Sequence, residues 1–105
     1  MARRNLKNQP LPGYIEREFR SQILGLARIL GWECYFSWTS IHSPAGFPDL
    51  VMVKSKRLIF AELKTEIGKV TDKQQGWLDK LAKTEAEVYL WRPHDFDDVA
   101  ALLQG

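Results

Sequence analysis

Two apolar runs separated by a short basic turn constrain the fold of this chain more than any other feature. Residues 49–54 (DLVMVK) and residues 57–64 (RLIFAELK) are rich in aliphatic side chains, and only two residues lie between them. This pattern predicts a β-hairpin. Because side chains alternate between the two faces of a strand, Glu62 and Lys64 are expected to point to the same side. An acid and an amine would then share one face of the hairpin.

The segments on either side of the hairpin complete a pattern of helices and strands. Apolar residues recur at helical spacing over residues 14–30, and aromatic residues cluster in residues 33–39, which predicts a helix followed by a strand. Thr71 is followed three residues later by Gln74, the capping pattern that opens a helix. Residues 86–91 (AEVYLW) predict a further strand, and a final helix follows it.

The predicted order is therefore α-β-β-β-α-β-α, an α/β fold with a mixed sheet flanked by helices. The helix between the third and fourth strands is a crossover, which normally makes those two strands parallel. Residues 1–12 are polar and contain two prolines, so we expect a flexible basic arm. Residues 13–105 are expected to form a single domain.

The bulk composition bears on the compartment in which the protein works. No apolar run approaches the roughly 20 residues that cross a bilayer, and the N-terminus lacks the apolar centre of a signal peptide. The single cysteine, Cys34, permits no internal disulfide. These features predict a cytoplasmic protein without a membrane partner.

Positive charge is concentrated in the first half of the chain. Residues 1–57 hold nine Lys/Arg against four Asp/Glu (net +5), whereas residues 58–105 hold six against nine (net −3). Clustered basic residues are what a phosphate-binding surface needs, although a solvated tail and a polar turn would have the same composition. The candidate nucleic-acid contacts are Arg3, Arg4, Lys7, His42, Lys54, Lys56 and Arg57.

Three charged residues of the hairpin are candidates for chemistry. Asp49 opens the first strand, and its carboxylate comes near Glu62 if the register of the hairpin is short. Two nearby carboxylates raise each other's pKa, and a hard divalent cation removes this conflict. Mg²⁺ needs only one or two carboxylates together with a substrate phosphate. Lys64 would lie beside such an ion, where it could orient a water or neutralise charge in the transition state.

The first helix and the second helix offer two further candidates. Glu16 lies about 60° from the centre of the apolar helix face, and Glu18 lies about 100° away on the other side, so Glu16 is better placed to reach the sheet. An ordinary acid in the first helical turn is the alternative. Gln74 could complete a capping box, or its amide could turn toward the strand that carries Glu62, and the sequence leaves both roles open.

Four segments, in this order, resemble the VRR-NUC domain, the virus-type replication-repair branch of the PD-(D/E)xK nuclease superfamily. The resemblance covers about residues 14–103. EREFRSQILGLARILGW is similar to the opening helix of the family, SPAGFPDLVMV to its Asp motif, LIFAELKTEIGKVT to its Glu-x-Lys motif, and QQGWLDKL to its Gln-x-x-Trp helix. An Asp followed at variable distance by Glu-x-Lys is a weak signal, GFPDL is more restrictive, and the ordered combination is much more specific.

The resemblance implies a PD-(D/E)xK restriction-endonuclease-like core and a Mg²⁺- or Mn²⁺-dependent endonuclease that hydrolyses DNA phosphodiesters. The implied metal ligands are Asp49, Glu62, the main-chain carbonyl of Leu63 and, directly or through water, Glu16. Lys64 would position the attacking water, and Gln74 falls on the glutamine of the family motif.

Family members that consist of this domain alone imply a homodimer that cuts branched DNA, in particular four-way junctions. DNA would then be the partner, and no organic cofactor is expected. A second interpretation is a nuclease that cuts flaps, or duplex DNA without branch selectivity. A third is a DNA-binding module whose nuclease site is vestigial.

Overall fold

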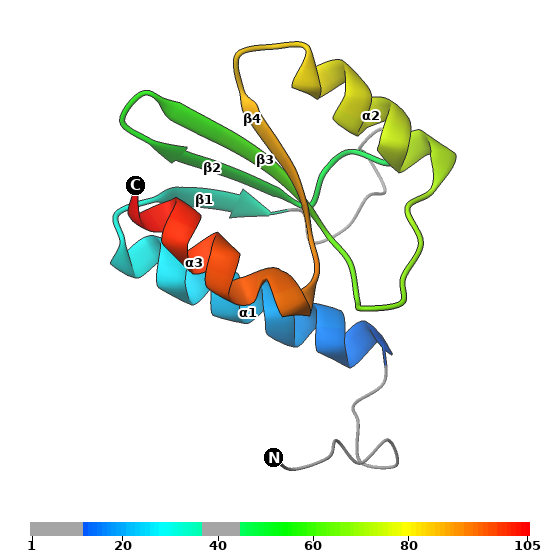
Figure 1. Ribbon diagram of the computed structural model, residues 1–105, viewed down its shortest axis with the longest axis horizontal. Helices are drawn as coiled ribbons and strands as arrows, with labels where there is room; N and C mark the ends of the chain where they lie inside the picture. The colour runs from blue at the N-terminus through cyan, green and yellow to red at the C-terminus, as the bar shows by residue number, and fades with distance from the viewer. Residues whose placement is uncertain (1–11, 37–44) are drawn as a thin grey trace.

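The computed structural model contains a four-stranded sheet with helices on both of its faces (Figure 1). It describes residues 12–36 and 45–105. The elements in chain order are α1 (Pro12–Ile29), β1 (Glu33–Phe36), β2 (Leu50–Lys54), β3 (Arg57–Leu63), α2 (Asp72–Ala82), β4 (Glu87–Trp91), a short 3₁₀ helix (Pro93–Asp95) and α3 (Phe96–Gln104). The predicted order α-β-β-β-α-β-α is confirmed.

The sheet has the mixed topology that the crossover helix predicts. Its strand order is β1-β2-β3-β4, and β1, β2 and β3 form an antiparallel meander. β4 follows α2 and pairs in parallel with β3. In the hairpin, Leu50 pairs with Ala61 and Lys54 pairs with Arg57. This register sets Asp49, which directly precedes Leu50, opposite Glu62.

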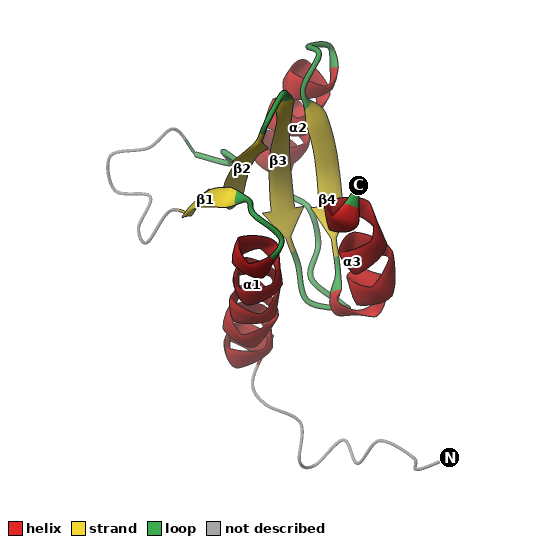
Figure 2. Ribbon diagram, turned by 90° about the vertical axis from the view of Figure 1, so that its left-hand side faces the viewer, coloured by secondary structure: helices red, strands yellow, loops and turns green. Residues whose placement is uncertain are grey.

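The buried core lies on the face of the sheet that α1 and α3 cover, and α2 packs on the opposite face (Figure 2). The apolar members of this core are Phe19, Ile23, Leu24, Ala27, Trp32, Leu50, Met52, Ile59, Ala61, Leu63, Trp91, Val99 and Leu103. Ile59, Ala61 and Leu63 alternate with residues of the other face, as expected for a strand. The indole N–H of Trp32 donates a hydrogen bond of 2.9 Å to the carbonyl of Leu103, which links the end of α1 to the end of α3.

The boundaries of α1 differ slightly from the prediction. The helix begins at Pro12, which we expected to be the last residue of the arm, and it ends at Ile29. The fixed φ of proline suits the first turn of a helix, where no N–H is needed. Gly31 adopts a φ of 93°, and the N–H of Trp32 reaches back to the carbonyl of Ala27 at 2.9 Å. This is a Schellman ending, in which glycine takes the left-handed conformation without strain.

No helix in the described part of the chain has the length and apolar character that crossing a membrane requires.

Candidate active site

The loop that carries Asp49 is held against the first turn of α2. Gly46 adopts a φ of 88°, and a Cβ atom built there would lie 2.6 Å from the carbonyl carbon of Lys73. Only glycine permits both this backbone conformation and this close approach. The next residue, Phe47, packs edge-on against Trp77 of α2, with ring centroids 5.0 Å apart. These contacts bring Asp49 to the same end of the sheet as the start of α2.

Asp49 bridges to the neighbouring strand through its carboxylate. Its Oδ2 atom accepts a hydrogen bond of 2.9 Å from the N–H of Leu63. Burial raises the pKa of the Asp49 carboxyl above its usual value, while this hydrogen bond and the positive charges of Lys64 and Arg20 act in the opposite direction. The carboxylate therefore lies in a poorly solvated position at the end of β2.

Glu62 is the most perturbed acid of the site. The residue is 2% exposed, and its Oε1 atom is buried without a hydrogen-bond partner among the described residues. Its Oε2 atom accepts a hydrogen bond of 2.9 Å from Gln74 and lies 3.9 Å from the Nζ atom of Lys64. Burial, together with the negative charge of Asp49, raises the pKa of Glu62 to about 8. Ionising Glu62 in this position is costly even with Lys64 nearby, so a further cation would favour the charged form.

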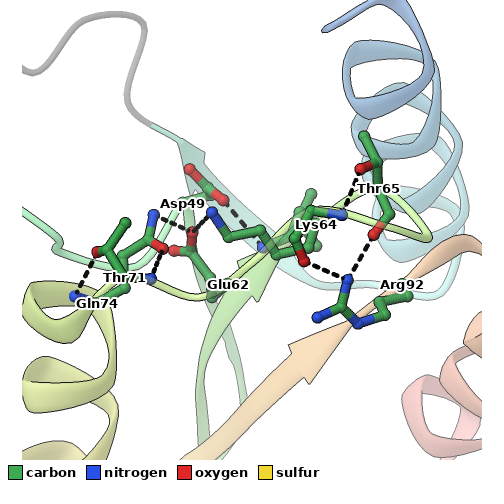
Figure 3. A network of polar contacts seen from close by, with 9 residues as sticks. Asp49, Glu62, Lys64, Thr65, Thr71, Gln74 and Arg92 are labelled. Atoms are coloured by element: carbon green, nitrogen blue, oxygen red, sulfur yellow. Dashed lines mark hydrogen bonds and ion pairs between the residues drawn. The ribbon is translucent and has the colours of Figure 1, made fainter. Parts of the chain in front are cut away.

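Gln74 performs both of the roles that the sequence left open (Figure 3). Its Oε1 atom accepts a hydrogen bond of 2.9 Å from the N–H of Thr71, and its own N–H donates to Thr71 Oγ1 at 3.1 Å. This capping box turns the Nε2 atom of the amide toward Glu62. Because the backbone N–H of Thr71 can only donate, it fixes which end of the amide faces the acid.

The first helix places Glu16, and not Glu18, beside the acids. Burial raises the pKa of Glu16, and the negative charge of Asp49 raises it further, whereas Lys64 and Arg20 lower it. Glu18 is exposed. Sequence reasoning did not single out Arg20, although its spacing of four residues from Glu16 predicts that both lie on one face of the helix.

The connection that follows Lys64 is held by the end of β4. The N–H of Lys64 donates to the carbonyl of Trp91 at 3.0 Å. The Nη1 atom of Arg92 donates to the carbonyls of Thr65 and Gly68 at 2.6 Å and 2.7 Å. Figure 3 labels Arg92 and Thr65. Arg92 thus fixes the turn beside Lys64, a role that its position directly after a strand did not reveal.

The carboxylate oxygens at this site are suitable ligands for a divalent cation. The half-buried carboxylate of Asp49 lies beside the buried carboxylate of Glu62, and one oxygen of Glu62 lacks any hydrogen-bond partner among the described residues. Hard cations such as Mg²⁺ bind oxygen ligands of this kind. In the part of the chain that the structure describes, no three His, Cys, Asp or Glu side chains are arranged as a complete metal site. Glu16, Asp49 and Glu62 thus do not form a three-acid group, and a cation bound by the two hairpin carboxylates would need water or phosphate oxygens as further ligands.

The basic residues of the hairpin turn lie far from these acids. About five residues of β3 separate Arg57 from Glu62, roughly 17 Å along an extended strand. Arg57 is engaged within the fold, because it donates to both carboxylate oxygens of Glu87 at 2.8 Å and 2.7 Å. It also lies over the ring of Trp32, 4.9 Å from the ring centroid. Of the other candidate DNA contacts, Arg3, Arg4, Lys7 and His42 lie outside the described residues.

Comparison with known proteins agrees with the resemblance drawn from the motifs. The family model described as the VRR-NUC domain matches residues 3–94. A solved VRR-NUC domain protein superposes with a TM-score of 0.67 at 18% identity, over 85% of this chain and 84% of that chain. Hjc of Archaeoglobus fulgidus, described as a Holliday junction resolvase from an archaeal hyperthermophile, gives a TM-score of 0.51 at 23% identity, over 73% and 67% of the two chains. No curated protein sequence matches the chain.

Proposed function

The chain belongs to the VRR-NUC domain family, a family of nucleases, and from this premise we propose that it is a metal-dependent DNA endonuclease selective for branched DNA. The observation that carries the proposal is the Oε1 atom of Glu62, which is buried beside Asp49 without a hydrogen-bond partner among the described residues. Natural proteins rarely bury a carboxylate oxygen in this way unless something else binds there.

The residues of the site divide the chemistry of phosphodiester hydrolysis between them. Asp49, Glu62 and the carbonyl of Leu63 would hold Mg²⁺ or Mn²⁺, with Glu16 completing the set directly or through water. An ion bound by these residues would polarise the scissile phosphate and lower the pKa of a water bound to it. Hydrolysis joins the water oxygen to phosphorus and breaks one phosphorus–oxygen ester bond of the DNA backbone.

Two residues support this reaction without holding the ion themselves. The ammonium of Lys64, 3.9 Å from Glu62 Oε2, can orient the attacking water and stabilise the negative charge that develops on the phosphate. Gln74 keeps Glu62 in place through its hydrogen bond of 2.9 Å, so the second oxygen of that acid stays available.

Branch selectivity and a homodimer form the finer part of the proposal. The similarity in fold to a protein described as a Holliday junction resolvase supports a four-way junction as substrate. Two copies related by a two-fold axis would present two equivalent sites, which suits symmetric cuts in two strands.

A cleavage assay with three labelled substrates tests the proposed function. A four-way junction, a flap and a plain duplex are each incubated with Mg²⁺, with Mn²⁺ and with EDTA. We expect metal-dependent cuts in the junction and much slower cutting of the duplex, with the Asp49→Asn variant as the inactive control. If no substrate is cut with either metal, the nuclease proposal fails. If junction and duplex are cut at equal rates, only the branch selectivity fails.

Removing residues 1–11, which contain Arg3, Arg4 and Lys7, is expected to weaken DNA binding and to reduce its dependence on salt. Each phosphate contact that is lost lowers the slope of log K against log[salt] by about 0.9 for duplex DNA. Binding is measured by fluorescence anisotropy over a series of NaCl concentrations. A variant with Lys69→Gln, Lys80→Gln and Lys83→Gln, three exposed lysines, controls for the loss of three positive charges. Equal slopes for the truncated and intact proteins would show that these residues do not contact phosphate.

A further inference from the structure

Arg20 lies at the same end of the molecule as the acids of the site. It follows Glu16 by one turn of α1, so the two side chains share a face of the helix. Its guanidinium carbon is 5.2 Å from the centroid of the Phe36 ring. Phe36 ends β1 and pairs with Leu50, the residue that follows Asp49. The cation is therefore positioned by an aromatic ring beside the strand end that carries Asp49.

The donors of Arg20 are not used within the described part of the protein. Arg57 is held by Glu87, and Arg92 is held by two main-chain carbonyls. Arg20, in contrast, makes no hydrogen bond or ion pair with any described residue, and its contact is with the face of the Phe36 ring. An aromatic ring orients a guanidinium without occupying its N–H groups, so the planar fork stays available to a ligand.

The charge of Arg20 is felt by two of the acids. It lowers the pKa of Glu16 and that of Asp49, against the larger effect of burial. Arg20 belongs to α1, whereas Lys64 directly follows β3, the strand that carries Glu62. The two cations therefore approach the site from different elements of the fold.

We propose that Arg20 binds a DNA backbone phosphate adjacent to the scissile phosphate, an inference that rests on the proposed nuclease function. The guanidinium fork matches two phosphate oxygens, and the cation–π contact with Phe36 positions it before the DNA arrives. A cation at this edge also counters the repulsion between an acidic site and a polyanionic substrate. Arg20 would hold the strand in position while the residues around Glu62 carry out the reaction.

Replacing Arg20 with glutamine is expected to raise KM for the junction by about 10- to 100-fold, the range for a lost hydrogen bond to a charged group. The value of kcat should change by less than about threefold, because the reacting groups remain. The salt slope of binding should fall by about one. Arg20→Lys keeps the charge, and hence the salt slope, but loses the fork, so its KM should lie between those of the wild type and Arg20→Gln.

The matched control is Arg28→Gln, in the last turn of the same helix and exposed. Arg28 lies eight residues beyond Arg20, roughly 12 Å along the helix axis, and its substitution should leave KM, kcat and the salt slope unchanged. Thermal unfolding and Mn²⁺ calorimetry are measured for every variant. Arg20→Gln is expected to keep the wild-type fold and to bind Mn²⁺ at least as tightly as the wild type, because a nearby positive charge is removed.

The outcomes separate this inference from the function on which it rests. If the wild type cuts no DNA with metal, the proposed nuclease function fails. If the wild type cuts the junction and Arg20→Gln matches Arg28→Gln in KM and salt slope, the phosphate contact is overturned. If Arg20→Gln lowers kcat with KM unchanged, Arg20 acts at the reacting centre and the assignment to a neighbouring phosphate is overturned.

Discussion

Lys64→Ala is expected to slow DNA cleavage by about 10²- to 10⁴-fold, the range for removing a positioned catalytic group, while DNA affinity changes by less than about tenfold. The ammonium lies 3.9 Å from Glu62 Oε2, and the Lys64 side chain is only 15% exposed. A group held in this way stabilises charge that develops during the reaction more than it strengthens ground-state binding. The rate constant is measured under single-turnover conditions, and binding is measured in EDTA.

Lys69→Ala is the control for Lys64→Ala, because Lys69 is an exposed lysine on the connection between β3 and α2. It should retain the wild-type cleavage rate. Unfolding temperatures of both variants show whether each protein is folded under the assay conditions. A folded Lys64→Ala protein that cleaves within tenfold of the wild-type rate would remove Lys64 from the mechanism.

The second prediction concerns a substitution of Glu62 that is expected to raise the stability of the protein and to remove its activity. Glu62→Gln is expected to stabilise the metal-free protein at pH 8 while abolishing cleavage. The pKa of Glu62 is raised to about 8 in the fold by burial and by the charge of Asp49, whereas an unfolded glutamate has its usual pKa of 4.5. Between these two values the folded state binds a proton that the unfolded state has released.

The sign of the pH dependence follows from this difference in proton binding. Between about pH 4.5 and pH 8 the free energy of unfolding falls as pH rises, by up to about 1.4 kcal/mol per pH unit. The total loss is on the order of a few kcal/mol. Glu16 and Asp49, whose pKa values are also raised by burial, contribute in the same direction. Glutamine at position 62 removes the largest part of this slope and can still accept the hydrogen bond from Gln74.

In the wild type, a bound divalent cation should restore the free energy of unfolding that is lost as the pH rises. Binding to the folded state alone raises the free energy of unfolding in proportion to the logarithm of metal concentration. Thermal unfolding is therefore recorded from pH 5 to pH 8 in EDTA and in Mn²⁺, with the exposed Glu85→Gln as a control. A wild-type profile that is flat in EDTA, or equal Mn²⁺ stabilisation of the wild type and Glu62→Gln, would contradict a buried metal-binding carboxylate.

Much of the fold could be predicted because the determining signals are local. The alternation of residues 57–63 sets Ile59, Ala61 and Leu63 in the core, and the spacing of Thr71 and Gln74 predicts the cap that opens α2. A helix between two strands makes those strands parallel because a short crossover has few compact alternatives. The hairpin pattern likewise indicated that Asp49 comes near Glu62 if the register is short, and the pairing of Leu50 with Ala61 meets that condition.

The partners of individual side chains could not be read in this way. Arg57 belongs to a basic turn whose composition predicts a phosphate contact. In the structure its side chain pairs with Glu87, thirty positions later in the chain. Gln74 serves the cap and Glu62 at once, since the helix start lies directly beside β3. Arg92 donates hydrogen bonds to the carbonyls that follow Lys64, because β4 runs parallel to β3 and ends beside it.

The chain thus determines by its own periodicity which residues form strands and helices and which faces are apolar, because these properties depend on neighbours a few positions apart. The tertiary structure decides which charged side chains pair with each other and which keep their hydrogen-bonding groups for a ligand. Arg20 illustrates the division. Helical spacing predicts that it shares a face with Glu16, but only the packing of α1 against β1 sets it over the Phe36 ring, with its donors unused by the described residues. Such choices depend on the distances between elements that are far apart in the sequence, which no local pattern encodes.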